Sequence, residues 1–108
     1  MMNFLGSCNV QRERIFVYHI TIDGKKIGNI NELHRFLQEN LALDTIYFEN
    51  LEALWDGLTS HVSMPLTLQW LDFQMSRRAL GNYADELMNL FYEIDEELEE
   101  LFTFILKL

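Results

Sequence analysis

The sequence predicts an α/β domain in which a three-stranded parallel sheet is flanked by about four helices. Three observations support this. Three short segments rich in β-branched and aromatic residues are spaced along the chain, two helical segments separate each from the next, and 108 residues leave room for one core. Because helical crossovers favour parallel neighbours with right-handed connections, we expect a single compact domain.

The first strand follows a polar leader. Residues 1–14 mix polar and small residues without periodicity, so we expect a loosely ordered leader, with the domain itself spanning residues 15–108. Residues 15–22 read IFVYHITI and end at a strong turn signal, Asp23-Gly24. This pattern predicts the first strand.

Two amphipathic helices are predicted next. Asn31 is placed to cap the first, whose apolar positions recur at helical spacing: Leu33, Phe36, Leu37 and Leu41. Residues 42–48 break the pattern, and Asn50 is placed to cap the second helix, with apolar positions Leu51, Leu54, Leu58 and Val62. The opposite side of this second helix carries Glu49, Glu52, Asp56, Thr59 and Ser60.

The second half repeats the alternation. Pro65 starts a short strand over residues 66–70 (LTLQW), where a proline costs no ladder hydrogen bond. A helical pattern runs from Asp72, is interrupted at Gly81-Asn82, and continues over residues 83–98. Residues 101–106 (LFTFIL) predict a third strand, which we expect to be buried on both faces because it is apolar nearly throughout.

The charge balance indicates which partners to expect. The chain has seventeen acidic and eight basic residues, which gives a net charge of -9 at pH 7, and no basic cluster exceeds a pair of arginines. Nucleic acid is therefore not expected as a partner, because binding a polyphosphate needs a basic face. A cationic protein is the natural complement, although an acidic surface that only confers solubility remains the alternative.

The sequence offers no set of residues with the spacing that a metal or cofactor site needs. The single cysteine, Cys8, allows no internal disulfide and fits a reducing cytoplasm. His19, His34 and His61 show no spacing that would place two of them on one helix face as metal ligands. No apolar stretch approaches a membrane span, and the start of the chain does not fit a secretory signal. We therefore expect a cytoplasmic protein with no membrane contact, no metal and no cofactor.

One pair of carboxylates is the strongest candidate for catalytic residues in the sequence. Glu52 and Asp56 are four residues apart, so they lie one turn apart on the same helix face. Such a pair could act as the acid and base of a small hydrolase if burial separated their proton affinities. A solvated face, or a face kept for a cationic partner, needs no such pocket. We expect no catalytic residues and no enzyme.

One segment carries a family resemblance. Residues 23–60 read DGKKIGNINELHRFLQENLALDTIYFENLEALWDGLTS, and this segment resembles the barstar family, most specifically in ENLEALWD and its flanks. PLTLQW and Phe73 continue the similarity, which covers residues 15–106. The resemblance implies a barstar-like fold and inhibition of a small basic ribonuclease. The second helix and the loop before it would enter the nuclease's phosphate-binding cleft.

The resemblance also implies roles for individual residues. Asp56 would be the central charge, with Glu52 beside it, Trp55 and Thr59 packed against the partner, and Glu93 and Glu97 as further acidic contacts from the last helix. For Trp55 a place in the core remains the alternative. Asn50 matches a contact position and is also explained as a helix cap.

Four positions depart from the family pattern. Ile46, Phe48, Ser60 and His61 stand where the family example has tyrosine, glycine, glycine and tryptophan. Since aromatic anchors carry much of an interface's energy, these differences are expected to select the target. An acidic adaptor that binds a different basic protein or toxin, without inhibiting a ribonuclease, is the alternative function.

Overall fold

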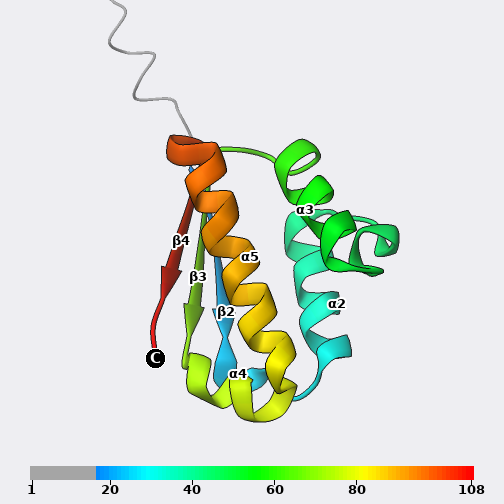
Figure 1. The fold of residues 1–108 in the computed structure, drawn as a ribbon, viewed down its shortest axis with the longest axis vertical. Helices are drawn as coiled ribbons and strands as arrows, with labels where there is room; N and C mark the ends of the chain where they lie inside the picture. The colour runs from blue at the N-terminus through cyan, green and yellow to red at the C-terminus, as the bar shows by residue number, and fades with distance from the viewer. Residues whose placement is uncertain (1–16) are drawn as a thin grey trace, which may run out of the picture.

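The computed structural model describes residues 17–108 of the chain, which form one sheet and a layer of helices (Figure 1). The predicted leader, and residues 15 and 16 of the predicted first strand, lie outside the described residues. The elements follow in the order β2 (Tyr18–Asp23), η1 (Gly24–Lys26), α2 (Ile30–Leu41), η2 (Thr45–Phe48), α3 (Leu51–Ser60), β3 (Leu66–Leu71), α4 (Phe73–Leu80), α5 (Asn82–Leu98), η3 (Glu99–Leu101) and β4 (Phe102–Leu106).

The sheet has three parallel strands, as predicted, and their order is β2-β3-β4. In its register Tyr18 lies beside Leu66, and Leu66 lies beside Phe102. The pairing extends beyond the strands, because the Tyr18 N–H donates to the carbonyl oxygen of Pro65 at 2.9 Å. Pro65 therefore precedes β3 and still contributes its acceptor to the sheet.

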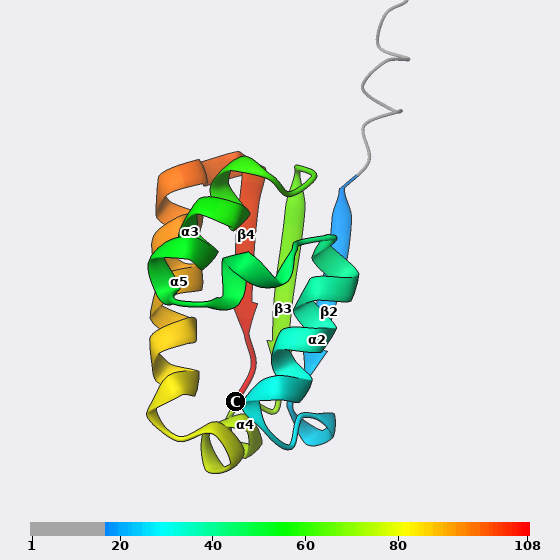
Figure 2. The same ribbon diagram turned by 90° about the vertical axis from the view of Figure 1, so that its right-hand side faces the viewer.

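Among residues 17–108, side chains are buried on only one face of the sheet, so the prediction that the third strand is buried on both faces is wrong. Buried side chains alternate with exposed or partly exposed ones along every strand. The helices α2, α3 and α5 lie on one side of the sheet (Figures 1 and 2). The strand order explains this, because two right-handed crossovers that advance in the same direction leave their helices on the same face.

The helix starts follow capping chemistry. Asn29, and not Asn31, caps α2: its side-chain oxygen accepts from the Glu32 N–H at 2.9 Å, and the Glu32 carboxylate accepts from the Gly28 N–H at 2.7 Å. These two hydrogen bonds fix the start one turn before Leu33 and place Asn31 inside the helix. The prediction for α3 is confirmed, because the Asn50 side chain accepts from the Ala53 N–H at 2.7 Å.

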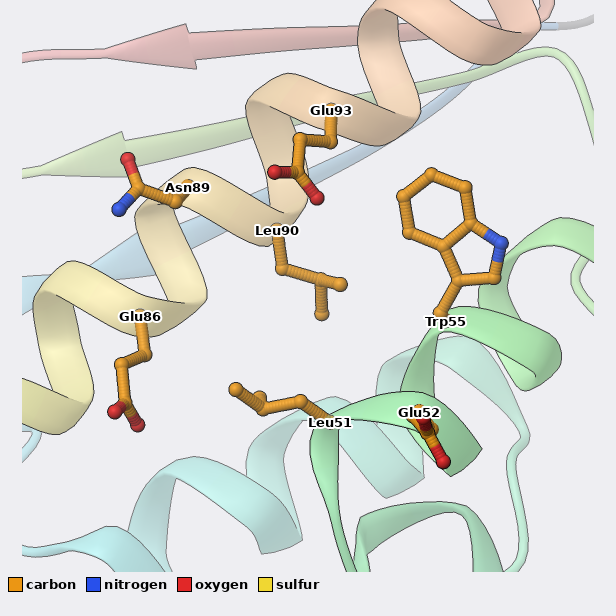
Figure 3. Close-up of a pocket in the computed structure, with 7 residues that line it drawn as sticks. All are labelled: Leu51, Glu52, Trp55, Glu86, Asn89, Leu90 and Glu93. Carbon is orange, nitrogen blue, oxygen red and sulfur yellow. The ribbon is translucent and has the colours of Figure 1, made fainter.

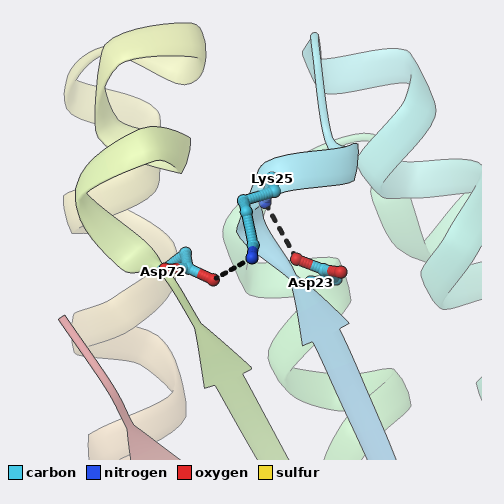
Figure 4. A network of polar contacts seen from close by, with 3 residues as sticks. All are labelled: Asp23, Lys25 and Asp72. Atoms are coloured by element: carbon cyan, nitrogen blue, oxygen red, sulfur yellow. Dashed lines mark hydrogen bonds and ion pairs between the residues drawn. The ribbon is translucent and has the colours of Figure 1, made fainter.

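The ends of β2 and β3 meet at a close contact. A Cβ atom on Gly24 would overlap the carbonyl oxygen of Asp72, so only glycine lets η1 approach this turn. The Asp23 carboxylate accepts from the Lys25 N–H at 3.0 Å, and the Lys25 ammonium lies 3.9 Å from the Asp72 carboxylate (Figure 4). These contacts hold the carboxyl-terminal ends of two strands together.

The interior is organised around Trp70. Its indole N–H donates to the Ser76 hydroxyl at 2.9 Å, and its ring packs edge to face on the Phe73 ring, with 4.9 Å between the ring centroids. Ser76 is the one fully buried polar side chain among residues 17–108, so the hydrogen bond satisfies both groups. The core of β3 is thereby joined to α4.

The helical break and the last strand differ slightly from the predicted bounds. The break falls at Gly81, whose φ of 65° suits glycine, and Asn82 already opens α5. Leu101 belongs to η3 and is exposed, so β4 begins at Phe102. The Asp95 carboxylate of α5 accepts from the Phe104 N–H at 2.8 Å. The break and the third strand are otherwise confirmed.

Candidate partner-binding site

A groove of about 440 Å³ lies between α3 and α5 (Figure 3). Helix α3 contributes Leu51, Glu52 and Trp55, and helix α5 contributes Glu86, Asn89, Leu90 and Glu93. Side chains of Leu51, Trp55 and Leu90 lie between the two helices, whereas Glu86 and Glu93 lie near opposite ends (Figure 3). The groove therefore has an apolar interior and an acidic rim.

The spacing of residues in the two helices produces this groove. Glu86, Leu90 and Glu93 recur at intervals of four and three along α5, so they form one stripe on its surface. Leu51 and Trp55 are one turn apart on α3 and face that stripe. The other side of α3 buries Leu54, Gly57 and Leu58 against the core.

The charges around the groove have one sign. Glu52, Glu86 and Glu93 are its charged lining residues, and each is exposed. Both ion pairs within residues 17–108, Lys25 with Asp72 and Arg77 with Asp85, lie elsewhere. Over the same range no group of three His, Cys, Asp or Glu side chains is arranged to hold a metal ion. The groove thus presents carboxylates that lack a cationic neighbour in this part of the chain.

The outer side of α3 carries the other predicted contacts. Asp56 and Ser60 are exposed, and Asp56 does not line the groove. The hydroxyl of Thr59 is half-buried and donates to the Trp55 carbonyl oxygen at 2.8 Å. Of the carboxylate pair, only Glu52 borders the groove, so the two do not share an enclosed pocket of the kind that acid–base catalysis requires.

The loop before α3 is anchored by two aromatic rings. The Tyr47 ring packs on Gly57, where a Cβ atom would lie 2.9 Å from the ring, and its centroid is 5.2 Å from that of His61. The Phe48 ring lies 5.1 Å from that of His34 and is half-buried against the core. Ile46 stays 56% exposed, which makes it the outermost apolar side chain of η2.

A hydrogen bond ties α2 to α5 beneath this loop. His34 Nε2 lies 2.8 Å from the Tyr83 hydroxyl oxygen. Burial lowers the pKa of His34. Burial, and then the charge of Glu86, raise the pKa of Tyr83. Since Phe48 also packs on His34, this junction links η2 to the helix that forms one wall of the groove.

The structure brings only some of the predicted residues together. Glu52, Trp55 and Glu93 share the groove, and Asp56, Ser60 and His61 continue along the exposed side and end of α3. Glu97 is exposed on α5 outside the groove. Asn50 uses its side-chain oxygen as a helix cap, and Phe48 points toward the core.

Four groove residues were not identified from the sequence as site residues: Leu51, Glu86, Asn89 and Leu90. Leu51 and Leu90 have the helical spacing of core positions, which conceals that they border a groove. The signal for the others was the interval from Glu86 through Asn89 to Glu93, which places all three on one side of α5.

Comparisons with known proteins agree on one family. The family model described as "Barstar (barnase inhibitor)" matches residues 17–108. The chain is also 42% identical over 88 residues to "Putative ribonuclease inhibitor YrdF" of Bacillus subtilis (strain 168), an alignment that covers 82% of this chain and 97% of that protein. Within residues 17–108, no helix combines the length and apolar character needed to cross a membrane.

Proposed function

The chain belongs to the barstar family, and from that premise we propose that it inhibits a small basic ribonuclease by occluding the active site. It would act in the cytoplasm as an immunity or antitoxin protein. Family members are inhibitors and not enzymes, and the name of the Bacillus subtilis relative supports the same type of role.

The observation that carries the proposal is the convergence of carboxylates from two helices beside a half-buried tryptophan. Glu52 of α3 and Glu93 of α5 border the same groove as Trp55 (Figure 3). A ribonuclease must bind phosphates, so its cleft presents cationic groups. Carboxylates presented on a rigid surface are complementary to such a cleft, and this complementarity both guides encounter and excludes wrong partners.

The mechanism we propose is non-covalent. Helix α3 and the loop η2 enter the nuclease cleft, with Asp56 as the central charge and Glu52 beside it. Trp55 supplies apolar contact, and Glu93 and Glu97 extend the acidic surface on α5. The rigid anchoring of η2 through Tyr47 supports this mechanism, because a preorganised loop loses little conformational entropy on binding.

Target choice would depend on the positions that depart from the family pattern. Ile46, Ser60 and His61 are all exposed around η2 and the end of α3, where they could meet a partner directly. Phe48 would act through the loop instead, because its ring packs on His34. These four residues would therefore distinguish this inhibitor from its relatives by two different routes.

The test is inhibition of a barnase-like ribonuclease by the full chain at low and high salt. We expect stoichiometric inhibition that weakens as salt screens the charges, and that weakens by about tenfold or more in Asp56→Ala. The matched control is Glu39→Ala, which removes an exposed carboxylate on α2 in the hollow beside β2.

Two outcomes would revise the proposal. Equal inhibition by Asp56→Ala and Glu39→Ala would remove α3 from the contact. No inhibition by the unmodified chain, together with salt-dependent binding to another basic protein, would favour the acidic adaptor.

A further inference from the structure

We propose that Glu86 and Asn89 form a second contact region, in which the end of the groove near Leu51 receives an arginine or lysine side chain of the partner. This inference rests on the proposed function, because it assigns a specific part of the partner to the same face. It extends the site toward the start of α5, whereas Glu93 and Glu97 extend it toward the end.

The position of Glu86 is the first argument. Glu86 lies seven residues before Glu93, which is about two helical turns, so the two carboxylates mark opposite ends of one groove. Asp56 stands outside the groove altogether. A cation bound at the Glu86 end would therefore be separate from the contact that we assign to Asp56.

The lining chemistry selects the occupant. A basic side chain has an aliphatic stem and a charged head, and it buries the stem while keeping the head in a polar setting. Leu51 and Leu90 supply apolar surface for the stem, and the Glu86 carboxylate, on the Leu51 side of α5, supplies oxygen acceptors for the head (Figure 3). Asn89 adds a polar group farther from Leu51. An apolar side chain would leave the carboxylate unmatched, and an acidic one would be repelled.

The charged residues that line the groove all have the same sign, which favours binding of a cation. The groove holds Glu52, Glu86 and Glu93 with no lysine or arginine in its lining. An incoming cation is attracted by carboxylates of one sign, and salt weakens this attraction because the carboxylates are exposed. The acidic side chains lie on rigid helices, so binding need not order a loop.

A metal ion fits this site poorly. Hard divalent cations need several converging oxygen ligands, and the described residues contain no such arrangement of three ligating side chains. Leucine side chains between the carboxylates also offer nothing to a small bare ion. The mixture of apolar and acidic lining therefore favours an organic cation.

The first experiment uses N-acetyl-arginine amide as the probe on the full chain, followed by NMR on the methyl groups of Leu51 and Leu90. N-acetyl-citrulline amide is the matched control ligand, because it keeps the shape and removes the charge. We expect the arginine amide to shift these methyl signals with roughly millimolar affinity, and the citrulline amide to shift them much less.

Two variants locate the binding. Glu86→Gln should weaken arginine amide binding several-fold, whereas Glu96→Gln, which removes an exposed carboxylate of α5 outside the groove, should leave it within twofold. Both residues are exposed, so neither change threatens the fold. Equal shifts from the two ligands, or equal binding by the two variants, would overturn the proposal.

The second experiment separates this inference from the proposed function. Affinity for a barnase-like ribonuclease is measured for the unmodified chain, Asp56→Ala, Glu86→Gln and Glu96→Gln. An affinity loss of about tenfold in Glu86→Gln, against a much smaller loss in Glu96→Gln, supports the second contact region.

The failures of the two proposals have different signatures. Inhibition that depends on Asp56 but responds equally to Glu86→Gln and Glu96→Gln overturns the inference and leaves the proposed function standing. If arginine amide binding depends on Glu86 but the chain inhibits no barnase-like ribonuclease, the proposed function is overturned and the inference about Glu86 stands.

Discussion

The two tryptophans of this chain occupy opposite kinds of surroundings. Trp70 is completely buried, its indole N–H is bonded to Ser76, and aromatic rings surround it. Trp55 is half-buried on α3, faces the groove beside Glu52 and Glu93, and its indole nitrogen has no hydrogen-bond partner within residues 17–108. The difference teaches that a tryptophan whose N–H is satisfied inside belongs to the core, whereas one left half-buried at the surface keeps an apolar face and an N–H that a partner can use.

The largest expected effect is on the interior side of this comparison. Trp70→Ala should lower the free energy of unfolding by about 3–5 kcal/mol, because it removes a large buried ring and leaves a cavity. Chemical denaturation followed by circular dichroism measures this. A loss below about 1 kcal/mol would mean that the interior can close around the gap, and Trp70 would not be central to the core.

The second expected effect is on the groove side. Trp55→Ala should weaken binding to the inhibited ribonuclease by about thirtyfold, or about 2 kcal/mol, because a large aromatic contact is lost. Its unfolding free energy should fall by clearly less than that of Trp70→Ala. The comparison breaks if Trp55→Ala is as destabilising as Trp70→Ala while its affinity for the ribonuclease is unchanged.

A third change tests how the loop η2 is joined to the interior. Gly57→Ala places a methyl group against the Tyr47 ring and should destabilise the protein by about 1–3 kcal/mol. Without that contact the same change would stabilise α3 by about 0.5–1 kcal/mol. The sign of the change in unfolding free energy therefore shows whether the Tyr47 ring packs on Gly57. The control is Gly57→Ala combined with Tyr47→Ala, which should cost less than the sum of the single changes if the two side chains collide.

The smallest expected effect concerns pH at the junction below the loop. Burial lowers the pKa of His34 below its ordinary value of 6.5, so the unfolded chain takes up this proton first as the pH falls. The contribution of His34 to stability is therefore complete above pH 6.5 and is lost as the pH falls through the lowered pKa. Stability curves from pH 8 to 5 should be flatter for His34→Gln than for the unmodified chain.

Tyr83 supplies the opposite arm of that measurement. Its pKa is raised above 10.0, so the neutral hydroxyl stabilises the fold below pH 10 and this contribution is lost as the pH rises further. Tyr83→Phe should remove the alkaline loss and keep most of the packing. An unchanged pH profile in both variants would show that the junction with His34 does not respond to protonation.

The sequence predicted the fold well because its signals were local. Runs such as residues 66–70 and the Gly81-Asn82 break identify strands and boundaries by composition alone, and the family resemblance is confirmed by the match over residues 17–108. The capping asparagine was chosen wrongly because Asn29 and Asn31 have the same chemistry. Two hydrogen bonds distinguish them: the Glu32 N–H donates to the Asn29 side chain, and the Gly28 N–H donates to the Glu32 carboxylate.

The groove was predicted less completely than the fold, because it depends on which helix faces meet. That Glu52 and Glu93 share one groove follows from packing between helices far apart in the chain, and sequence spacing gives no such distance. Leu51 and Leu90 have the apolar character of core residues and still border the groove. The exposed face of the sheet was missed for a similar reason, since a strand such as β4 is apolar in composition but alternates in burial.

The hydrogen bond from the Phe104 N–H to the Asp95 carboxylate affects how the edge of the sheet could pair with other molecules. β4 is an edge strand, and unpaired edge amides invite the strands of other molecules to add to a sheet. The carboxylate fills one such amide and places a negative charge where an incoming strand would align. Addition of a strand along β4 would therefore have to break this hydrogen bond and bury the Asp95 charge.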